Sequence, residues 1–136
     1  APRPLSERRL KRSPLRDIAG IIRSFHYAAY STLFLQRSVM VEDRPVMEAA
    51  ADYWYREAVN AFIGAYFETI GTSAVLPQDS VQLAVLLKVY MLDKAVYELG
   101  YELQSRPDWL AVPLRGIRHV LEYTPPMREE ETGDRR

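Results

Sequence analysis

The sequence has 136 residues, with 18 Lys and Arg against 18 Asp and Glu, 48% hydrophobic residues and no Cys. A chain of this length forms one domain at most and can bury a core without disulfides. The lack of cysteine excludes disulfide frameworks, thiol nucleophiles and Cys-ligated zinc. The two histidines, His26 and His119, are too far apart to form a helical metal pair, so we expect no metal site.

The longest run without a charged residue, from Ser24 to Gln36, is shorter than the roughly 20 apolar residues of a membrane-spanning helix. The N-terminus lacks the apolar core of a signal peptide. We therefore expect no membrane partner and a cytoplasmic location.

Basic residues gather at the start of the chain. Residues 1–23 contain seven Lys or Arg and two acidic residues. Such a run can contact nucleic acid, but the interleaved aromatic residues of a single-strand binder are absent from it. We interpret residues 1–13 as a basic arm that is solvated or packs on an acidic protein surface, and we expect no nucleic-acid partner.

Proline and capping residues divide the chain into helices. Ser13 and Pro14 predict the start of a first helix over about 14–37. Its apolar residues repeat at helical spacing: Leu15, Ile18, Ile22, Phe25, Ala29 and Leu33. Pro45 predicts the start of a second helix that stops at Gly71. The predicted stripe of this helix includes Ala50, Trp54, Ala58, Ala61 and Ala65, and its alanines would let a neighbouring helix approach closely.

Asp79 and Gln82 resemble a capping box and predict a third helix over about 80–104, which ends before Arg106 and Pro107. One apolar stripe runs along it: Val85, Val89, Leu92, Val96, Leu99 and Leu103. A second stripe starts with Leu83, Leu86, Leu87 and Tyr90 and then turns polar. Because a helix that is apolar on most sides is usually central, we expect this one to be central.

A short fourth helix is predicted from near Pro113 to Leu121. No strand alternation is present, so the fold class is all-α, with about four helices in residues 14–123. Residues 124–136 have no apolar pattern and are predicted to be a disordered tail.

The second half of the third helix and the turn after it carry the main candidate site. Its residues are Lys94, Tyr97, Glu98, Tyr101, Glu102, Arg106 and Trp109. On a helix the two tyrosines and the two glutamates form parallel lines, because the members of each pair are four residues apart. Aromatic faces beside carboxylates suit a sugar, whose C–H face packs on the rings while its hydroxyls bond the carboxylates. In the alternative interpretation the tyrosines are core residues, and Lys94 and Glu98 form a surface pair.

We expect no catalytic residue. Two carboxylates on one helix do not face each other across a scissile bond, as a glycosidase requires. Ser24 and His26 are two positions apart and point to different helix faces, so they cannot form a triad. We interpret His26 as a hydrogen-bonded helix residue.

Three residues of the first helix are candidates for a supporting role. Asp17, next to Arg16, lies in the first turn, where the helix dipole favours a carboxylate, and this explains it as a structural residue. The functional alternative is that Asp17 or Arg23 braces an active-site loop supplied from before Ala1.

Two blocks of sequence carry a resemblance to a known family. The first comprises Pro4-Leu5-Ser6-Glu7-Arg8-Arg9-Leu10-Lys11-Arg12-Ser13-Pro14-Leu15-Arg16-Asp17-Ile18-Ala19-Gly20 and Arg23-Ser24-Phe25-His26-Tyr27-Ala28-Ala29. The second comprises Asp93-Lys94-Ala95-Val96-Tyr97-Glu98-Leu99-Gly100-Tyr101-Glu102, Arg106-Pro107-Asp108-Trp109 and Val112-Pro113-Leu114-Arg115-Gly116-Ile117. In this order they resemble the C-terminal part of bacterial maltokinase, a kinase-like domain often fused behind trehalose synthase. The resemblance extends to about His119.

The resemblance implies ATP- and magnesium-dependent phosphorylation of maltose to maltose 1-phosphate, for α-glucan (glycogen) synthesis. It also implies a two-lobed fold similar to aminoglycoside phosphotransferases, of which this chain would be the helical part of the C-terminal lobe. In that family an Asp-Phe-Glu-Gly-Glu-type metal-binding motif lies directly upstream of the segment that begins here at Ala1. We therefore expect ATP and Mg²⁺ to bind the parent enzyme and not this segment, which alone should be inactive.

In this interpretation the third helix forms a wall of the pocket for maltose or a related α-glucoside. The partners would be the remaining kinase lobe and a trehalose synthase domain. Two alternatives stay open: a free-standing helical interaction module, or a docking surface for trehalose synthase to which Tyr53, Trp54 and Tyr55 contribute. A Trp in such a run is more often a core residue.

Overall fold

The computed structural model describes residues 13–35 and 40–122, and this part of the chain is helical. Its elements are α2 (Leu15–Leu35), α3 (Arg44–Ile70), α4 (Ser80–Ser105), the 3₁₀ turn η1 (Pro107–Trp109) and α5 (Ala111–Glu122). Four helices and no strand in these residues confirm the all-α prediction. Residues 1–12 of the predicted basic arm and all of the predicted tail lie outside the described residues.

Two predicted helix ends are formed by the residues that the sequence indicated. The carboxylate of Asp79 accepts a hydrogen bond from the backbone N–H of Gln82 at 2.7 Å, which caps α4. Gly71 ends α3 with φ 57°, a left-handed value that favours glycine, and its N–H donates to the carbonyl of Phe67. The last helix begins at Ala111, two residues before the predicted Pro113.

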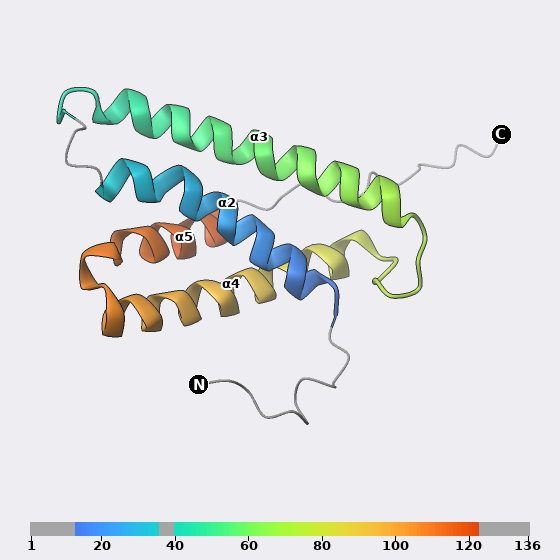
Figure 1. Ribbon diagram of the computed structural model, residues 1–136. Helices are drawn as coiled ribbons and strands as arrows, with labels where there is room; N and C mark the ends of the chain where they lie inside the picture. Colours follow the sequence, from blue (N-terminus) through green and yellow to red (C-terminus); the bar gives the residue numbers. More distant parts are fainter. Residues whose placement is uncertain (1–12, 36–39, 123–136) are drawn as a thin grey trace.

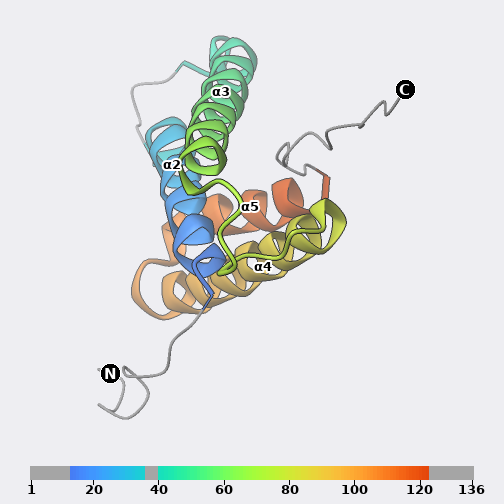
Figure 2. The ribbon, with the colours of Figure 1, turned by 90° about the vertical axis from the view of Figure 1, so that its right-hand side faces the viewer.

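Helix α2 is the central element of the described residues. Figure 1 shows α3 running beside α2, and Figure 2 shows α4 and α5 as a second pair that crosses it. Helix α2 contacts α3, α4, α5 and η1, whereas α4 contacts α2, α5 and η1. The prediction that the third helix is central is therefore wrong, because its apolar residues do not all find a neighbour.

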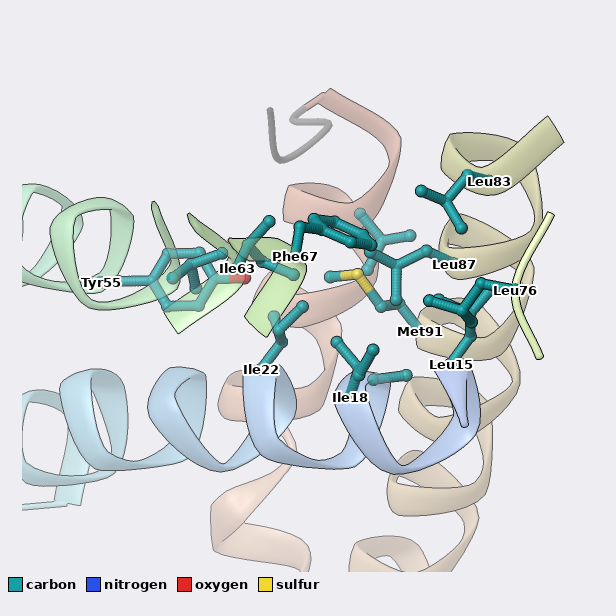
Figure 3. Close-up of a cluster of buried hydrophobic side chains, with 13 residues drawn as sticks. Leu15, Ile18, Ile22, Tyr55, Ile63, Phe67, Leu76, Leu83, Leu87 and Met91 are labelled. Atoms are coloured by element: carbon teal, nitrogen blue, oxygen red, sulfur yellow. The ribbon is translucent and has the colours of Figure 1, made fainter. Parts of the chain in front are cut away.

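The main core lies where α2, α3 and α4 meet, and Figure 3 shows its side chains pointing toward one another. Its fully buried members include Leu15, Ile18 and Ile22 of α2, Tyr55, Val59 and Ile63 of α3, and Leu83, Leu87 and Met91 of α4. Leu76, in the connection between α3 and α4, closes one end. The α2 residues are those that the helical spacing predicted.

The predicted stripe of the second helix is wrong. Ala50, Trp54, Ala61 and Ala65 are exposed, and Ala58 is half-buried. The buried face of α3 is instead Tyr55, Val59, Ile63 and Phe67. Both sets have helical spacing, but the second removes far more apolar area from water, so it faces the core.

A polar cluster is buried beside the core, between α2, α3 and α5. His26 is fully buried, with its ring 4.5 Å from the Tyr30 ring and 5.4 Å from the His119 ring. Neither nitrogen of His26 has a hydrogen-bond partner among the described residues, so the prediction of a hydrogen-bonded histidine is wrong. Tyr30 donates to Asp52, whose Oδ1 lies 3.3 Å from Nε2 of His119.

Burial, with the charge of Arg23 as a second cause, lowers the pKa of His26 to about 2. In the unfolded chain His26 takes up a proton near pH 6.5, whereas in the folded chain it stays neutral to a much lower pH. The folded state therefore loses stability as the pH falls below 6.5. We predict that the free energy of unfolding falls by about 1.4 kcal/mol per pH unit between pH 6.5 and 4.5 through His26 alone. Denaturant titrations followed by circular dichroism measure this slope.

The matched variant is His26→Phe, which replaces an unpartnered polar ring with an apolar one. At pH 7 it should be at least as stable as the wild type, because no buried nitrogen is left unpaired. Its stability should also respond less to acid. An unchanged slope in this variant would contradict the assignment.

Candidate functional site

A groove runs between α2 and α4, and it is made of two adjoining pockets. They have volumes of about 640 and 590 Å³ and share Gly20, Ser24, Lys94 and Tyr97. The larger pocket is also lined by Arg23, Tyr27, Glu98, Tyr101, Glu102 and Arg106. The smaller one is also lined by Arg16, Asp17, Ile21, Tyr90 and Asp93. We call the two together the α2–α4 groove.

The groove brings together nine of the ten residues that the sequence singled out, and the tenth, Trp109, packs behind it. The guanidinium of Arg106 lies 4.0 Å above the Trp109 ring, which places Trp109 beneath one of the groove's own residues. Residues from both predicted groups therefore share one surface, although Arg16 and Arg106 are in different pockets.

Arg23 and Glu98 form a buried ion pair across the groove. Nε and Nη2 of Arg23 both donate to Oε2 of Glu98, at 2.9 and 2.7 Å. The Arg23 side chain is 1% exposed, and that of Glu98 is 14% exposed. Charge-assisted hydrogen bonds of this kind fix both side chains, so the pair joins α2 to α4. The predicted surface pair between Lys94 and Glu98 is not what holds Glu98.

Glu102 is the second buried carboxylate. It receives two hydrogen bonds from Arg106, at 2.8 and 2.6 Å, and one from the hydroxyl of Tyr27 at 3.2 Å. Burial and the nearby Glu98 and Glu102 charges raise the pKa of Tyr27, so its hydroxyl stays a donor at neutral pH. The two carboxylates of α4 are therefore held by partners from α2 and from the turn after α4.

The two tyrosines of α4 are exposed along the groove. Tyr97 is 65% exposed and Tyr101 is 52% exposed, so the interpretation of these tyrosines as core residues is wrong. The ammonium of Lys94 lies 5.7 Å from the Tyr97 ring centroid, and the Arg106 guanidinium lies 5.8 Å from that of Tyr101. Each ring thus stands beside a cation, with much of its surface open to a ligand.

Arg16 and Asp17 line the smaller pocket at the start of α2. Asp17 lies in the first turn of the helix, as the structural interpretation requires. The alternative role of Asp17 or Arg23 in bracing a loop from before Ala1 stays a prediction.

Tyr27 and Gly116 are among the residues of this site that sequence reasoning missed. Tyr27 lies one turn after Arg23 on α2, but an isolated tyrosine gives no signal that distinguishes a groove residue from a core residue. Gly116 of α5 is buried against Arg23: an added Cβ would overlap both Nη atoms of that side chain. A glycine is therefore required here for close approach.

The arrangement suits recognition of a neutral polar ligand. It offers open aromatic faces, anchored carboxylate oxygens as acceptors, and Lys94 as a donor. Across residues 13–35 and 40–122, no three His, Asp or Glu side chains come together in a way that could hold a metal ion. No described helix has the length and apolar character needed to cross a bilayer. A comparison with models of known protein families finds no match to this chain.

We predict that Gly116→Ala destabilises the fold by about 1–3 kcal/mol, because the new methyl group displaces a guanidinium that Glu98 holds in place. Gly64→Ala is the matched control. Gly64 lies within α3, is exposed and has nothing within 4 Å of an added Cβ, so alanine should be neutral or stabilising there. Urea titrations of the two variants measure the difference, and equal stabilities would contradict the close approach.

Proposed function

We propose that this chain is the C-terminal helical segment of a maltokinase-like phosphotransferase, and that its α2–α4 groove forms a wall of the maltose site. The observation that carries the proposal is the pairing of exposed tyrosine rings with buried, anchored carboxylates along one groove. Sugar sites combine these two features, because the C–H face of a pyranose packs on a ring while its hydroxyls bond fixed polar groups.

The charges in the groove support a neutral ligand over an ionic one. Arg23 and Arg106 each neutralise one glutamate, so neither carboxylate needs a cation from the ligand. Both Arg23 donors go to Oε2 of Glu98, so Oε1 of this 14% exposed side chain can accept a hydrogen bond from a sugar hydroxyl, whereas Glu102, which is 2% exposed, holds Arg106 and Tyr27 in place. Because both carboxylates are already fixed, little side-chain entropy is lost when the sugar binds.

In this proposal the chain contributes binding and scaffold, and the chemistry belongs to the parent enzyme. ATP and Mg²⁺ would bind the remaining kinase lobe, because phosphoryl transfer depends on metal-assisted charge stabilisation. The parent would act in the cytoplasm on maltose or a related α-glucoside in α-glucan synthesis. A trehalose synthase domain would be its fused or separate partner.

A docking role for the α3 aromatic residues is the second candidate. Tyr53 and Trp54 are exposed, whereas Tyr55 is buried in the core. Trp54 lies edge-on to Phe25 with ring centroids 6.3 Å apart, so part of its surface is used within the fold. The observation that favours docking is thus the exposure of Tyr53 and of the remaining face of Trp54.

The first test uses the polypeptide that carries this sequence in cells. An antibody against the chain should detect a band far above 15.7 kDa, and that polypeptide should form maltose 1-phosphate from maltose, ATP and magnesium. A band only at the size of the chain, with no larger precursor, would contradict the proposal and favour a free-standing interaction module.

In that enzyme, Tyr101→Ala should raise the apparent KM for maltose roughly tenfold, because it removes an aromatic face worth about 1.4 kcal/mol. The value of kcat should change little, since the lost contact is made equally in the ground state and the transition state. Tyr53→Ala is the matched control, because Tyr53 is also an exposed tyrosine but lies on α3, away from the groove. Unchanged kinetics in a folded Tyr101→Ala enzyme would rule out the sugar contact.

A further inference from the structure

The outer face of α4 carries an apolar stripe that no described residue covers. Val85, Val89, Val96 and Leu103 are each 54–57% exposed, and Leu92 and Leu99 between them are half-buried. This is the stripe that the sequence predicted for the third helix, and it faces away from the core formed by Leu83, Leu87 and Met91. We call it the α4 seam.

The spacing of the α4 seam is that of a coiled coil. Its residues follow one another at intervals of four, three, four, three and four positions, which is a heptad pattern in which Val89, Val96 and Leu103 occupy a and Val85, Leu92 and Leu99 occupy d. The seam extends over about 28 Å at 1.5 Å per residue. Two of the three a positions are valine and two of the three d positions are leucine, a combination that favours two strands in parallel coiled coils, and such a narrow stripe suits one partner helix.

The charges beside the seam match a second copy of the same helix. In this register Lys88 occupies g and Asp93 occupies the following e position. Two parallel copies would bring Lys88 of each chain to Asp93 of the other, the pairing that sets partner and orientation in coiled coils. Lys88 uses one donor on the carbonyl of Leu121, at 3.2 Å, and keeps two others. Asp93 is exposed.

The next flanking pair permits close approach at one of its two positions. Gly100 occupies the following e position, where no side chain obstructs a neighbouring backbone, whereas Ala95 at the following g position is fully buried within the chain's own fold. Helix α5 packs along the g side of α4, where its exposed Leu121 lies beside Lys88.

We propose that the α4 seam is a dimerisation surface, on which a second copy of this chain packs its own α4 in a parallel, two-stranded arrangement. The interface buries the valine and leucine rows of both copies, and the two Lys88–Asp93 contacts fix their register. This inference does not rest on the sugar-binding proposal, because the valine and leucine rows of the seam do not line the groove, although Asp93 lies at the edge of both surfaces.

Sedimentation equilibrium of the 136-residue chain at micromolar concentrations should give twice its mass of 15.7 kDa. Val89→Asp should return the protein to a monomer, while circular dichroism stays unchanged because the side chain is exposed. Val46→Asp is the matched control: Val46 is an exposed valine near the start of α3 and should not affect the dimer. A folded wild-type chain that remains monomeric, or a dimer that survives Val89→Asp, would overturn the proposal.

Two further variants test the orientation. Asp93→Lys should weaken the dimer roughly tenfold through two new repulsions, and the double variant Lys88→Glu/Asp93→Lys should restore it. Because the chain has no Cys, Val89→Cys provides a single thiol that should form an intermolecular disulfide on oxidation, whereas Val46→Cys should not. A charge swap that fails to restore the dimer, or no disulfide at position 89, would overturn the parallel arrangement.

Discussion

The buried ion pair between Arg23 and Glu98 is the contact on which the arrangement of the helices depends most. Arg23 is on α2 and Glu98 is on α4, and the guanidinium rests against Gly116 of α5, so one side chain contacts three of the four described helices. Removing such a pair from water costs several kcal/mol per ion, and the attraction between the two charges offsets this cost only if their geometry is held closely. The glycine on α5 supplies that geometry because any larger residue would displace the guanidinium.

The same pair sets the properties of the groove. Glu98 is fixed by Arg23, and one turn further along α4 Glu102 is fixed by Arg106 and Tyr27. Both carboxylates are held by other side chains of the protein, and Tyr97 and Tyr101, which neighbour them on α4, remain exposed to solvent. Helix α4 therefore has a fixed polar side, a buried apolar side and an apolar seam that no described residue covers.

Local sequence signals predicted the helices well, but they could not show which apolar face of a helix is buried in the core. Asp79, Gly71 and Pro14 act within one turn of chain, so their effects can be read from sequence. The choice of Val59 over Ala58 for the core depends on which neighbour packs there, since both positions fit a helical stripe. The four-residue spacing of the site's tyrosines and glutamates is also a local signal. The Arg23–Glu98 pair joins residues 75 positions apart, so no spacing pattern in the sequence indicates it.

A double-mutant cycle on Arg23 and Glu98 tests this account most directly. Each single replacement by Met leaves one buried charge unpaired, and the double replacement leaves none. We predict that each single variant loses about 3 kcal/mol of unfolding free energy and that the double variant is more stable than Arg23→Met, which corresponds to a coupling of about 3 kcal/mol or more. Additive losses with a coupling near zero would show that the pair does not hold the helices together.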